Sequence, residues 1–270
     1  MARALVIVAL AALLVGCGSK HSAPPPPPPP HEFRVVFPEG FTRAQMAARV
    51  GAVAKIAQRE RKGKPVRMTA KGYLAATRKA VIPCFAPRRQ TNLEGFLFPS
   101  TYDFTALTTA KQLVQAQVEA FCEALQQVGL SYARSKNLTD YDVLKIASLV
   151  QGEAVVEGDR AKIAAVIYNR LHLRMPLGID AALRYALHIP GTKSILESQL
   201  QNQTPYNLRV HDGLPPTPIN NPGLASLQAA AHPAHVDYLY FVAEPDKRHH
   251  FFTASASAFQ TYLCQHGYGC

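Results

Sequence analysis

The sequence has 270 residues, of which 48% are hydrophobic and 17% are charged. This apolar content can form a sizeable core and excludes wholesale disorder. After residue 20, no apolar run approaches the roughly 20 residues needed to cross a bilayer, which excludes a polytopic membrane protein. Lys and Arg outnumber Asp and Glu by 29 to 18, giving a net charge of +11. Such a charge favours anionic surroundings, whether nucleic acid, acidic polymers or a membrane face, without selecting one of them.

The N-terminus has the layout of a secretory signal. Arg3 precedes an unbroken apolar stretch over residues 4–16, which is short for a membrane-spanning helix. The stretch ends in Leu-Val-Gly-Cys, which resembles the bacterial lipobox, where the signal is cut before a cysteine that carries lipid. We therefore expect a signal peptide over residues 1–16 and lipidation of Cys17. The alternatives are an uncleaved anchor, or an ordinary signal in which Cys17 is incidental.

A proline-rich segment follows the predicted lipid site. Residues 24–30 are seven consecutive prolines, which form a polyproline II helix and make a stiff spacer of about 20 Å. A proline-rich ligand for a partner domain is the alternative. We assign residues 17–32 as the lipidated cysteine and linker, so that the folded part begins near Phe33.

Four cysteines remain in the predicted folded part: Cys84, Cys122, Cys264 and Cys270. In an exported protein an even number favours disulfides, and the three pairings that four cysteines allow stay open. Because no two of them have the Cys-x-x-Cys spacing, neither a zinc site nor a thioredoxin-type motif is expected.

The hydrophobic periodicity predicts helices and strands mixed without βαβ regularity, so we predict an α+β fold of mixed helices and short strands. The expected strands cover residues 32–37, 237–243 and 249–253, and residues 93–104 form a strand–turn segment. Residues 205–223, rich in Pro and Gly, form a long rigid loop. The first expected helix begins after Thr42, which is its N-cap. Further helices are expected over residues 71–81, 108–128, 140–156, 159–173, 224–231 and 257–263.

Glu153 is the carboxylate that the pattern singles out. It falls four residues after Leu149 and three after Val150, so it projects from the apolar face of the helix predicted over residues 140–156. Gly152 beside it is unfavourable in a helix, which is easier to understand if another part of the protein approaches the backbone closely there. Desolvation would raise the pKa of Glu153, as a general acid requires. A buried glutamate paired with Arg or Lys is the structural alternative.

Other polar clusters carry weaker signals. Tyr206 and Asn207 lie on the proline-stiffened loop and offer an aromatic face and an amide, which suit sugars, although a surface crossover is the alternative. His249 and His250 are adjacent on a strand and point to opposite faces, so we expect no metal site there. The sequence has no Walker, Rossmann or nucleophile-elbow motif, which argues against nucleotide and esterase chemistry.

Several segments, in order, resemble the YceG-like (MltG-type) endolytic murein transglycosylases. The segment IASLVQGEA, which ends at Ala154, resembles the catalytic helix of that family. The resemblance covers about residues 33–265. Its other segments are FPEGF at 37–41, EGFLFPSTY at 94–102, IAAVIYNRL at 163–171, MPLGID at 175–180, Tyr206-Asn207, GLPPTPINNPG at 213–223, AAAHP at 229–233, DYLYFVA at 237–243 and HFFT at 250–253.

The resemblance implies a YceG-like catalytic domain over residues 93–270, preceded by its N-terminal part over residues 33–92. It implies that Glu153 is the catalytic residue. Gln151 occupies the position of the family's first acidic residue, so Gln151 is not expected to donate a proton. Family members usually carry a transmembrane segment and a LysM-like subdomain before the catalytic part. This sequence has a lipobox-like segment and a proline spacer instead, and we expect too few residues for the LysM-like subdomain. The resemblance also implies substrate binding, or orientation of Glu153, by Glu94, Asp180, Tyr206 and Asn207.

By the same resemblance, the protein is a lyase that cleaves the bond between N-acetylmuramic acid and N-acetylglucosamine and leaves 1,6-anhydro ends. Glu153 would act alone as acid and base, with no cofactor and no metal. We expect an envelope protein anchored to the membrane, with peptidoglycan strands and wall-synthesis enzymes as partners rather than nucleic acid. The alternatives are a hydrolytic muramidase that uses the same glutamate and a non-catalytic wall-binding scaffold lipoprotein.

Overall fold

The computed structural model describes residues 30–85 and 89–268. Residues 31–270 form one compact unit. The predicted signal peptide, the lipid site at Cys17 and almost all of the polyproline linker lie outside the described residues, and these predictions stay open. Within the described ranges, no helix is both long enough and apolar enough to cross a membrane.

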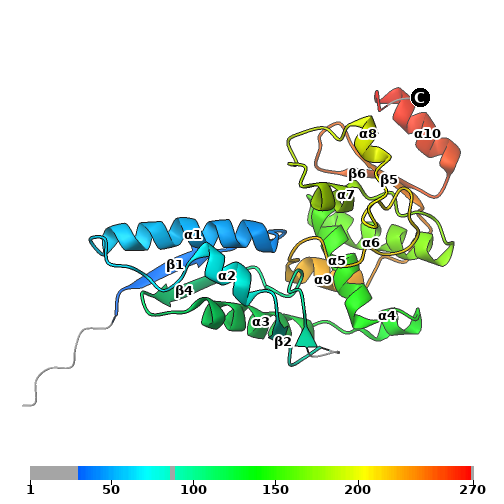
Figure 1. Ribbon diagram of the computed structural model, residues 1–270. Coiled ribbons are helices and arrows are strands. Elements are labelled where there is room, and N and C mark those ends of the chain that lie inside the picture. Colours follow the sequence, from blue (N-terminus) through cyan, green and yellow to red (C-terminus); the bar gives the residue numbers. More distant parts are fainter. Residues whose placement is uncertain (1–29, 86–88, 269–270) are drawn as a thin grey trace, which may run out of the picture. The chain divides into compact units, whose positions relative to one another are not determined.

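The first elements form a β-α-α-β arrangement (Figure 1). Strand β1 (Glu32–Val36) pairs antiparallel with β4 (Thr101–Thr105), in a register that places Arg34 opposite Asp103. Helices α1 (Arg43–Glu60) and α2 (Ala70–Ala76) lie between these strands in the chain and pack on each other, and α1 also packs on β1. This arrangement occupies residues 32–105, and the prediction that the sequence has too few residues for a LysM-like subdomain stays a prediction. The β1–β4 pairing also joins a strand of the predicted N-terminal part, residues 33–92, to a strand of the predicted catalytic domain, residues 93–270.

The helix predicted over residues 71–81 is shorter than expected. Helix α2 ends at Ala76, where the Thr77 hydroxyl donates to the Leu74 carbonyl at 3.0 Å. The chain then extends into β2 (Ala80–Val81), which pairs antiparallel with β3 (Arg89–Gln90). The backbone of Ala80 and Val81 therefore pairs with β3, although the helical periodicity predicted these residues as part of the helix.

Helix α5 (Asp140–Glu153) is the centre of the remaining helical core. It packs against α6 (Glu157–His172), α7 (Asp180–Leu187), α9 (Leu224–Ala231) and the short α4 (Ser131–Ser135). The Thr139 hydroxyl caps α5, and Thr109 does the same for α3 (Ala110–Gln126), each accepting from an otherwise unpaired N–H. Helix α5 ends at Glu153, three residues earlier than predicted, because Ala154 is extended.

The C-terminal strands and helix confirm the predicted order. Strand β5 (Tyr240–Ala243) pairs antiparallel with β6 (His250–Thr253), and α10 (Ala256–Gln265) packs on both. His249 is exposed, whereas the His250 side chain is buried and its Nδ1 lies 3.0 Å from Asp159 Oδ2. The two histidines thus face opposite ways as predicted. The sequence did not predict the short helices α4, α7 and α8 (Glu197–Leu200).

One disulfide joins Cys84 to Cys122 across a separation of 38 residues. Cys264 is also disulfide-bonded, and Cys270 lies outside the described residues. The structure therefore confirms that the chain contains disulfides and selects the Cys84–Cys122 pair among the open pairings.

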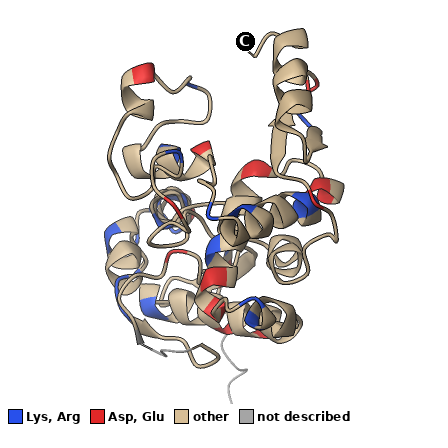
Figure 2. Ribbon diagram, turned by 90° about the vertical axis from the view of Figure 1, so that its right-hand side faces the viewer, with Lys and Arg blue, Asp and Glu red and all other residues tan. Residues whose placement is uncertain are grey.

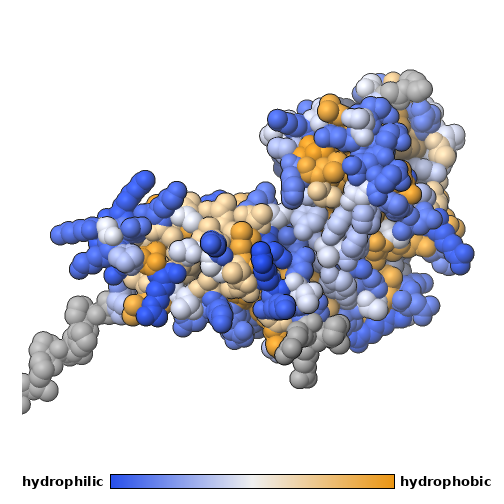
Figure 3. Space-filling model, viewed as in Figure 1, coloured by the Kyte–Doolittle hydropathy of each residue, from blue (hydrophilic) through white to orange (hydrophobic). Residues whose placement is uncertain are grey.

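The described surface mixes charge and hydropathy. Lys and Arg positions occur on several helices, with Asp and Glu interspersed (Figure 2). On the face shown in Figure 3, strongly hydrophobic residues form small separate groups among hydrophilic ones. The molecule is α+β, as the sequence predicts, with most large apolar side chains in one core cluster.

Candidate active site

Glu153 is the last residue of α5 and its side chain is half-buried. Burial, as the largest cause, and the nearby negative charge of Asp180 together raise the pKa of this carboxyl to about 7. A hydrogen bond from the Ala181 backbone N–H and the charges of Arg184 and Arg209 oppose the shift. A carboxyl with this pKa is partly protonated near neutral pH, so it can both donate and accept a proton.

Helix α7 approaches the end of α5 closely beside Glu153. A side chain at Gly152 would meet Ala181, Ile219 and Asn220. The prediction that Gly152 allows a close approach to the backbone is therefore confirmed. The approach also brings the N–H of Ala181 to the Glu153 carboxylate, and this contact fixes the position of the carboxylate.

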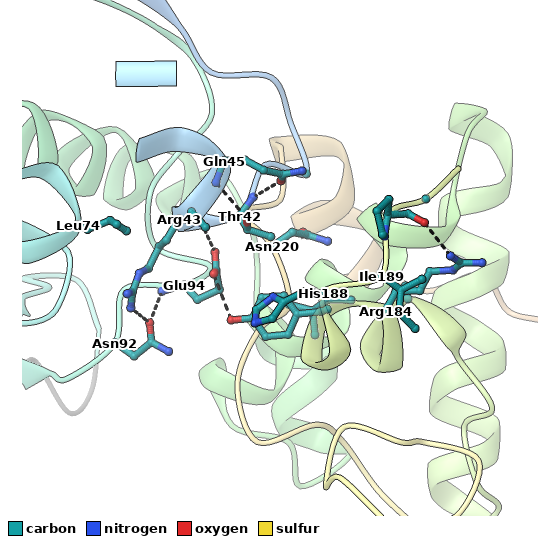
Figure 4. Close-up of a pocket in the computed structure, with 17 residues that line it drawn as sticks. Thr42, Arg43, Gln45, Leu74, Asn92, Glu94, Arg184, His188, Ile189 and Asn220 are labelled. Carbon is teal, nitrogen blue, oxygen red and sulfur yellow. Dashed lines mark hydrogen bonds between the residues drawn. The ribbon is translucent and has the colours of Figure 1, made fainter. Parts of the chain in front are cut away.

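A cavity of about 650 Å³ adjoins this contact (Figure 4). Ala181 lies in its wall as well as against Glu153, whereas Glu153 itself is not one of the lining residues. The other walls come from the start of α1, the turn that contains Glu94, helix α7 with the residues after it, and Ile219 with Asn220. This volume falls within the usual range for a site that binds a small ligand.

Glu94 is the carboxylate that lines the cavity directly. It is only 4% exposed, and burial raises its pKa to about 7. Its Oε1 accepts from the Arg43 backbone N–H and from Asn221 Nδ2, both at 2.9 Å, and its Oε2 accepts from the Tyr185 hydroxyl at 3.2 Å. These bonds hold the side chain in one orientation between α1, α7 and the proline-rich loop.

Asn221 connects the same three segments. Its Oδ1 accepts from the backbone N–H groups of Gly95 and Leu97, both at 2.9 Å. Its Nδ2 donates to the Phe41 carbonyl and to Glu94. Because Asn221 is fully buried and all these bonds are made, we assign it to holding the cavity walls together.

Asp180 and Arg209 form a two-point ion pair beside Glu153. Arg209 Nε and Nη2 donate to the two Asp180 oxygens at 2.6 and 2.9 Å. Both residues act electrostatically on the Glu153 carboxyl, in opposite directions. Asp180 therefore lies close enough to Glu153 for its charge to raise the pKa of that carboxyl.

The two loop residues differ in their surroundings. Tyr206 is half-buried, its hydroxyl lies 2.9 Å from Thr217 Oγ1, and its ring packs 5.5 Å from that of Tyr185 in the cavity wall. Asn207 is fully buried, and its Nδ2 donates to the carbonyls of Leu200 and Asn202. Asn207 thus organises its own loop, while Tyr206 lies against a cavity residue.

The part of the chain that the structure describes contains no group of three or more His, Cys, Asp or Glu side chains able to hold a metal ion.

Comparison with known proteins decides the family. The model of the YceG-like family matches residues 20–263. The chain belongs to the YceG-like family. Its fold agrees with a 2.6 Å crystal structure described as a YceG-like protein from Listeria monocytogenes, with a TM-score of 0.70 and 26% identity over 85% of this chain and 75% of that one.

Curated relatives of this YceG-like chain carry the name endolytic murein transglycosylase. The Bacillus subtilis protein is 38% identical over 156 residues, which cover 56% of this chain and 42% of the relative. A Streptococcus pneumoniae protein is 32% identical over 229 residues, which cover 78% of this chain and 40% of the relative. The chain thus spans about two fifths of the length of these relatives.

In this YceG-like chain, Gln151 serves the fold. Its Oε1 accepts from the Gly223 backbone N–H at 3.1 Å and from the Ser226 hydroxyl at 2.8 Å. Gly223 is the N-cap of α9, so Gln151 satisfies an N–H group at the start of that helix. An amide is sufficient for this contact.

Sequence reasoning missed four residues that build the cavity: Arg43, Tyr185, Asn220 and Asn221. Arg43 was indistinguishable from a surface polar residue in the pattern. Tyr185 lies on α7, which was not predicted. Only the Asn-Asn-Pro-Gly segment that contains Asn221 gave a signal, because it ends a rigid loop directly before a helix.

Proposed function

We propose that this protein cleaves murein glycan strands endolytically as a lytic transglycosylase, with Glu153 as the single general acid and base. The observation that carries the proposal is the half-buried Glu153 carboxyl, whose pKa is raised to about 7, beside Ala181 in the wall of a cavity of about 650 Å³. Membership of the YceG-like family and the names of the curated relatives support the same activity.

The proposed reaction needs one proton carrier. Protonated Glu153 donates to the oxygen that links N-acetylmuramic acid to N-acetylglucosamine, and the bond from this oxygen to the muramoyl C1 breaks. The electron pair of that bond stays on the leaving oxygen, and the muramoyl N-acetyl group stabilises the cation at C1. The Glu153 carboxylate then takes the proton of the muramoyl C6 hydroxyl, whose oxygen bonds to C1 and closes the 1,6-anhydro ring. Glu153 ends protonated, and no water is consumed.

The neighbours of Glu153 have supporting roles in this proposal. The Ala181 N–H and the Asp180–Arg209 pair orient the carboxylate and set its pKa. Glu94 faces the cavity and is the proposed sugar contact, with Tyr206 beside Tyr185 at its edge. Asn207 is the proposed support of the loop that carries Tyr206.

We also propose that the protein works in the bacterial envelope. The signal-like N-terminus and the lipobox-like Cys17 support a lipid anchor, and the disulfides support an oxidising compartment. Metabolic labelling with a lipid precursor tests the anchor, since label in the wild-type chain and none in Cys17→Ala is expected.

Digestion of uncrosslinked glycan by the purified full-length chain in detergent tests the activity. Mass spectrometry should detect ends lighter by one water than hydrolytic ends, and Glu153→Gln should form none while melting as the wild type does. Ends of hydrolytic mass would favour the muramidase alternative. Cleavage by Glu153→Gln at the wild-type rate would refute the assignment, and no cleavage by either chain would favour the non-catalytic scaffold.

A further inference from the structure

Two buried polar atoms lack hydrogen-bond partners among the residues that the structure describes. They are Arg43 Nε, a donor, and Asn220 Oδ1, an acceptor. Both residues line the cavity next to Glu153. Since buried polar groups in folded proteins are nearly always paired, two such atoms in the lining of one cavity point to a partner held there, either an ordered water or a ligand group.

The orientation of the Asn220 amide is fixed. Its Nδ2 donates to the Ser148 carbonyl at 2.8 Å, and a flipped amide would place two acceptor oxygens against each other. Asn220 is only 6% exposed, and its Nδ2 lies 3.6 Å from the point that a Cβ atom at Gly152 would occupy. The free acceptor is therefore held rigidly beside the last turn of α5, which carries Glu153.

The cavity presents complementary groups around this acceptor. In the view of Figure 4, Glu94 lies between Arg43 and Asn220, and the apolar side chains of Leu74 and Ile189 lie in the same lining. A ligand that satisfies these walls needs an N–H donor for Asn220, an oxygen acceptor for Arg43 Nε and a small apolar group. A secondary acetamide has all three.

We propose that Asn220 determines specificity for N-acetylated sugars by accepting the acetamido N–H in this cavity. The inference rests on the proposed function for the identity of the glycan. A glycan whose successive rings carry acetamido groups offers both an N–H donor and a carbonyl oxygen repeatedly along its length, so one strand can satisfy both unpaired atoms.

Binding measurements on the full-length chain test the proposal in the Glu153→Gln background, where no cleavage interferes. The probes are the tetramer of N-acetylglucosamine, the tetramer of glucose and a blocked trialanine peptide, which carries amide N–H groups without a sugar. We expect the Glu153→Gln chain, in which Asn220 is unchanged, to bind the tetramer of N-acetylglucosamine at least about tenfold more tightly than the other two probes.

Two substitutions separate recognition from folding. Asn220→Leu removes both the acceptor and the bond to Ser148, and we expect it to weaken binding of the acetylated tetramer about 10- to 100-fold with little change for the glucose tetramer. Asn220→Asp also loses the amide donor to Ser148 but keeps an acceptor oxygen, so it should retain the preference. Thermal melting of both variants controls for folding.

The results separate this proposal from the proposed function. An equal loss of preference for the acetylated tetramer in both variants would assign Asn220 a structural role and overturn the proposal. The proposal would also be overturned if the chain that keeps Asn220 showed no preference among the probes or preferred the peptide. If murein is cleaved but Asn220→Leu keeps the preference, only this inference fails. If murein is not cleaved but Asn220→Leu selectively loses the acetylated tetramer, the inference stands and the proposed reaction fails.

Discussion

The Cβ atom of Ala181 lies 3.0 Å from the point that a Cβ atom at Gly152 would occupy. The absence of a side chain at Gly152 therefore lets α7 pack against the last turn of α5. This packing places the Ala181 N–H beside Glu153, and Ala181 also lies in the cavity wall.

Gly152→Ala should reduce activity more than stability. The added methyl group must displace Ala181 by a few tenths of an ångström, and this shift disturbs the hydrogen bond from Ala181 to Glu153. The higher helix propensity of Ala, about 1 kcal/mol, offsets the destabilisation that the crowding causes. We expect glycan cleavage to slow at least about tenfold with Tm almost unchanged. Gly158→Ala in α6 is the control, because nothing lies within 4 Å of its added Cβ. Activity of Gly152→Ala at the Gly158→Ala level would contradict the role of this packing.

The pH dependence of cleavage should report the Glu153 carboxyl. The acid step needs the protonated form, so kcat/KM should fall as pH rises above about 7, where the carboxyl ionises. Asp180→Asn removes a charge that raises the pKa and should move this limb to lower pH. Arg209→Gln removes a charge that lowers the pKa and should move it to higher pH. The surface variant Asp103→Asn is the control and should not shift the pH profile. Shifts of the same sign in Asp180→Asn and Arg209→Gln would argue against Glu153 as the titrating group.

Glu94→Gln should stabilise the protein at alkaline pH. Burial raises the pKa of Glu94 from 4.5 to about 7, so the folded chain holds a proton that the unfolded chain releases between these values. The free energy of unfolding therefore falls as pH rises through this window, by on the order of 3 kcal/mol. Glutamine cannot ionise and can keep the bonds to Arg43, Asn221 and Tyr185.

Denaturant unfolding at pH 5 and pH 8 measures this effect. We expect Glu94→Gln to match the wild type at pH 5 and to exceed it at pH 8. The exposed Glu119→Gln in α3 is the control and should change neither value. A Glu94→Gln chain that is less stable than the wild type at pH 8 would mean that the ionised form is the favoured one in the fold.

Loss of the Cys84–Cys122 disulfide should destabilise the chain. Closing a loop of 38 residues removes conformational entropy from the unfolded state that corresponds to about 4 kcal/mol. We expect the double variant Cys84→Ser and Cys122→Ser to unfold at clearly lower guanidinium concentration than the wild type. Addition of reductant to the wild type should shift its midpoint in the same direction, and an unchanged midpoint in the double variant would contradict the prediction.

Local patterns predicted much of the fold. The cap at Thr42 predicted α1, and the apolar stripe over residues 140–156 predicted α5. The position of Glu153 on that stripe predicted that its carboxyl is desolvated. Helix α7 escaped prediction because it has only eight residues and follows Gly178 with no side-chain cap. The end of α2 was missed because Val81 pairs with Arg89 in a strand that the helical period cannot reveal.

The cavity itself could not be predicted from sequence patterns. Glu94 and Tyr185 meet across 91 residues and Glu94 and Asn221 across 127, and periodicity carries no information at that range. Asn220 and Asn221 are neighbours of the same type, yet one has an unpaired buried acceptor and the other holds the walls together. Only the packing of distant segments separates their roles.

The Asn221 hydrogen bonds make the cavity depend on segments that lie far apart in the sequence. They bridge separations of 124 to 180 residues, so they require the front part of the chain to pack against the loop that carries Asn221. A fragment that starts after residue 106 would retain Glu153 but lack Arg43, Asn92 and Glu94 from the cavity wall. Clipping the chain between β4 and α3 and releasing its front half would therefore silence the site while every helix from α3 onward remained present.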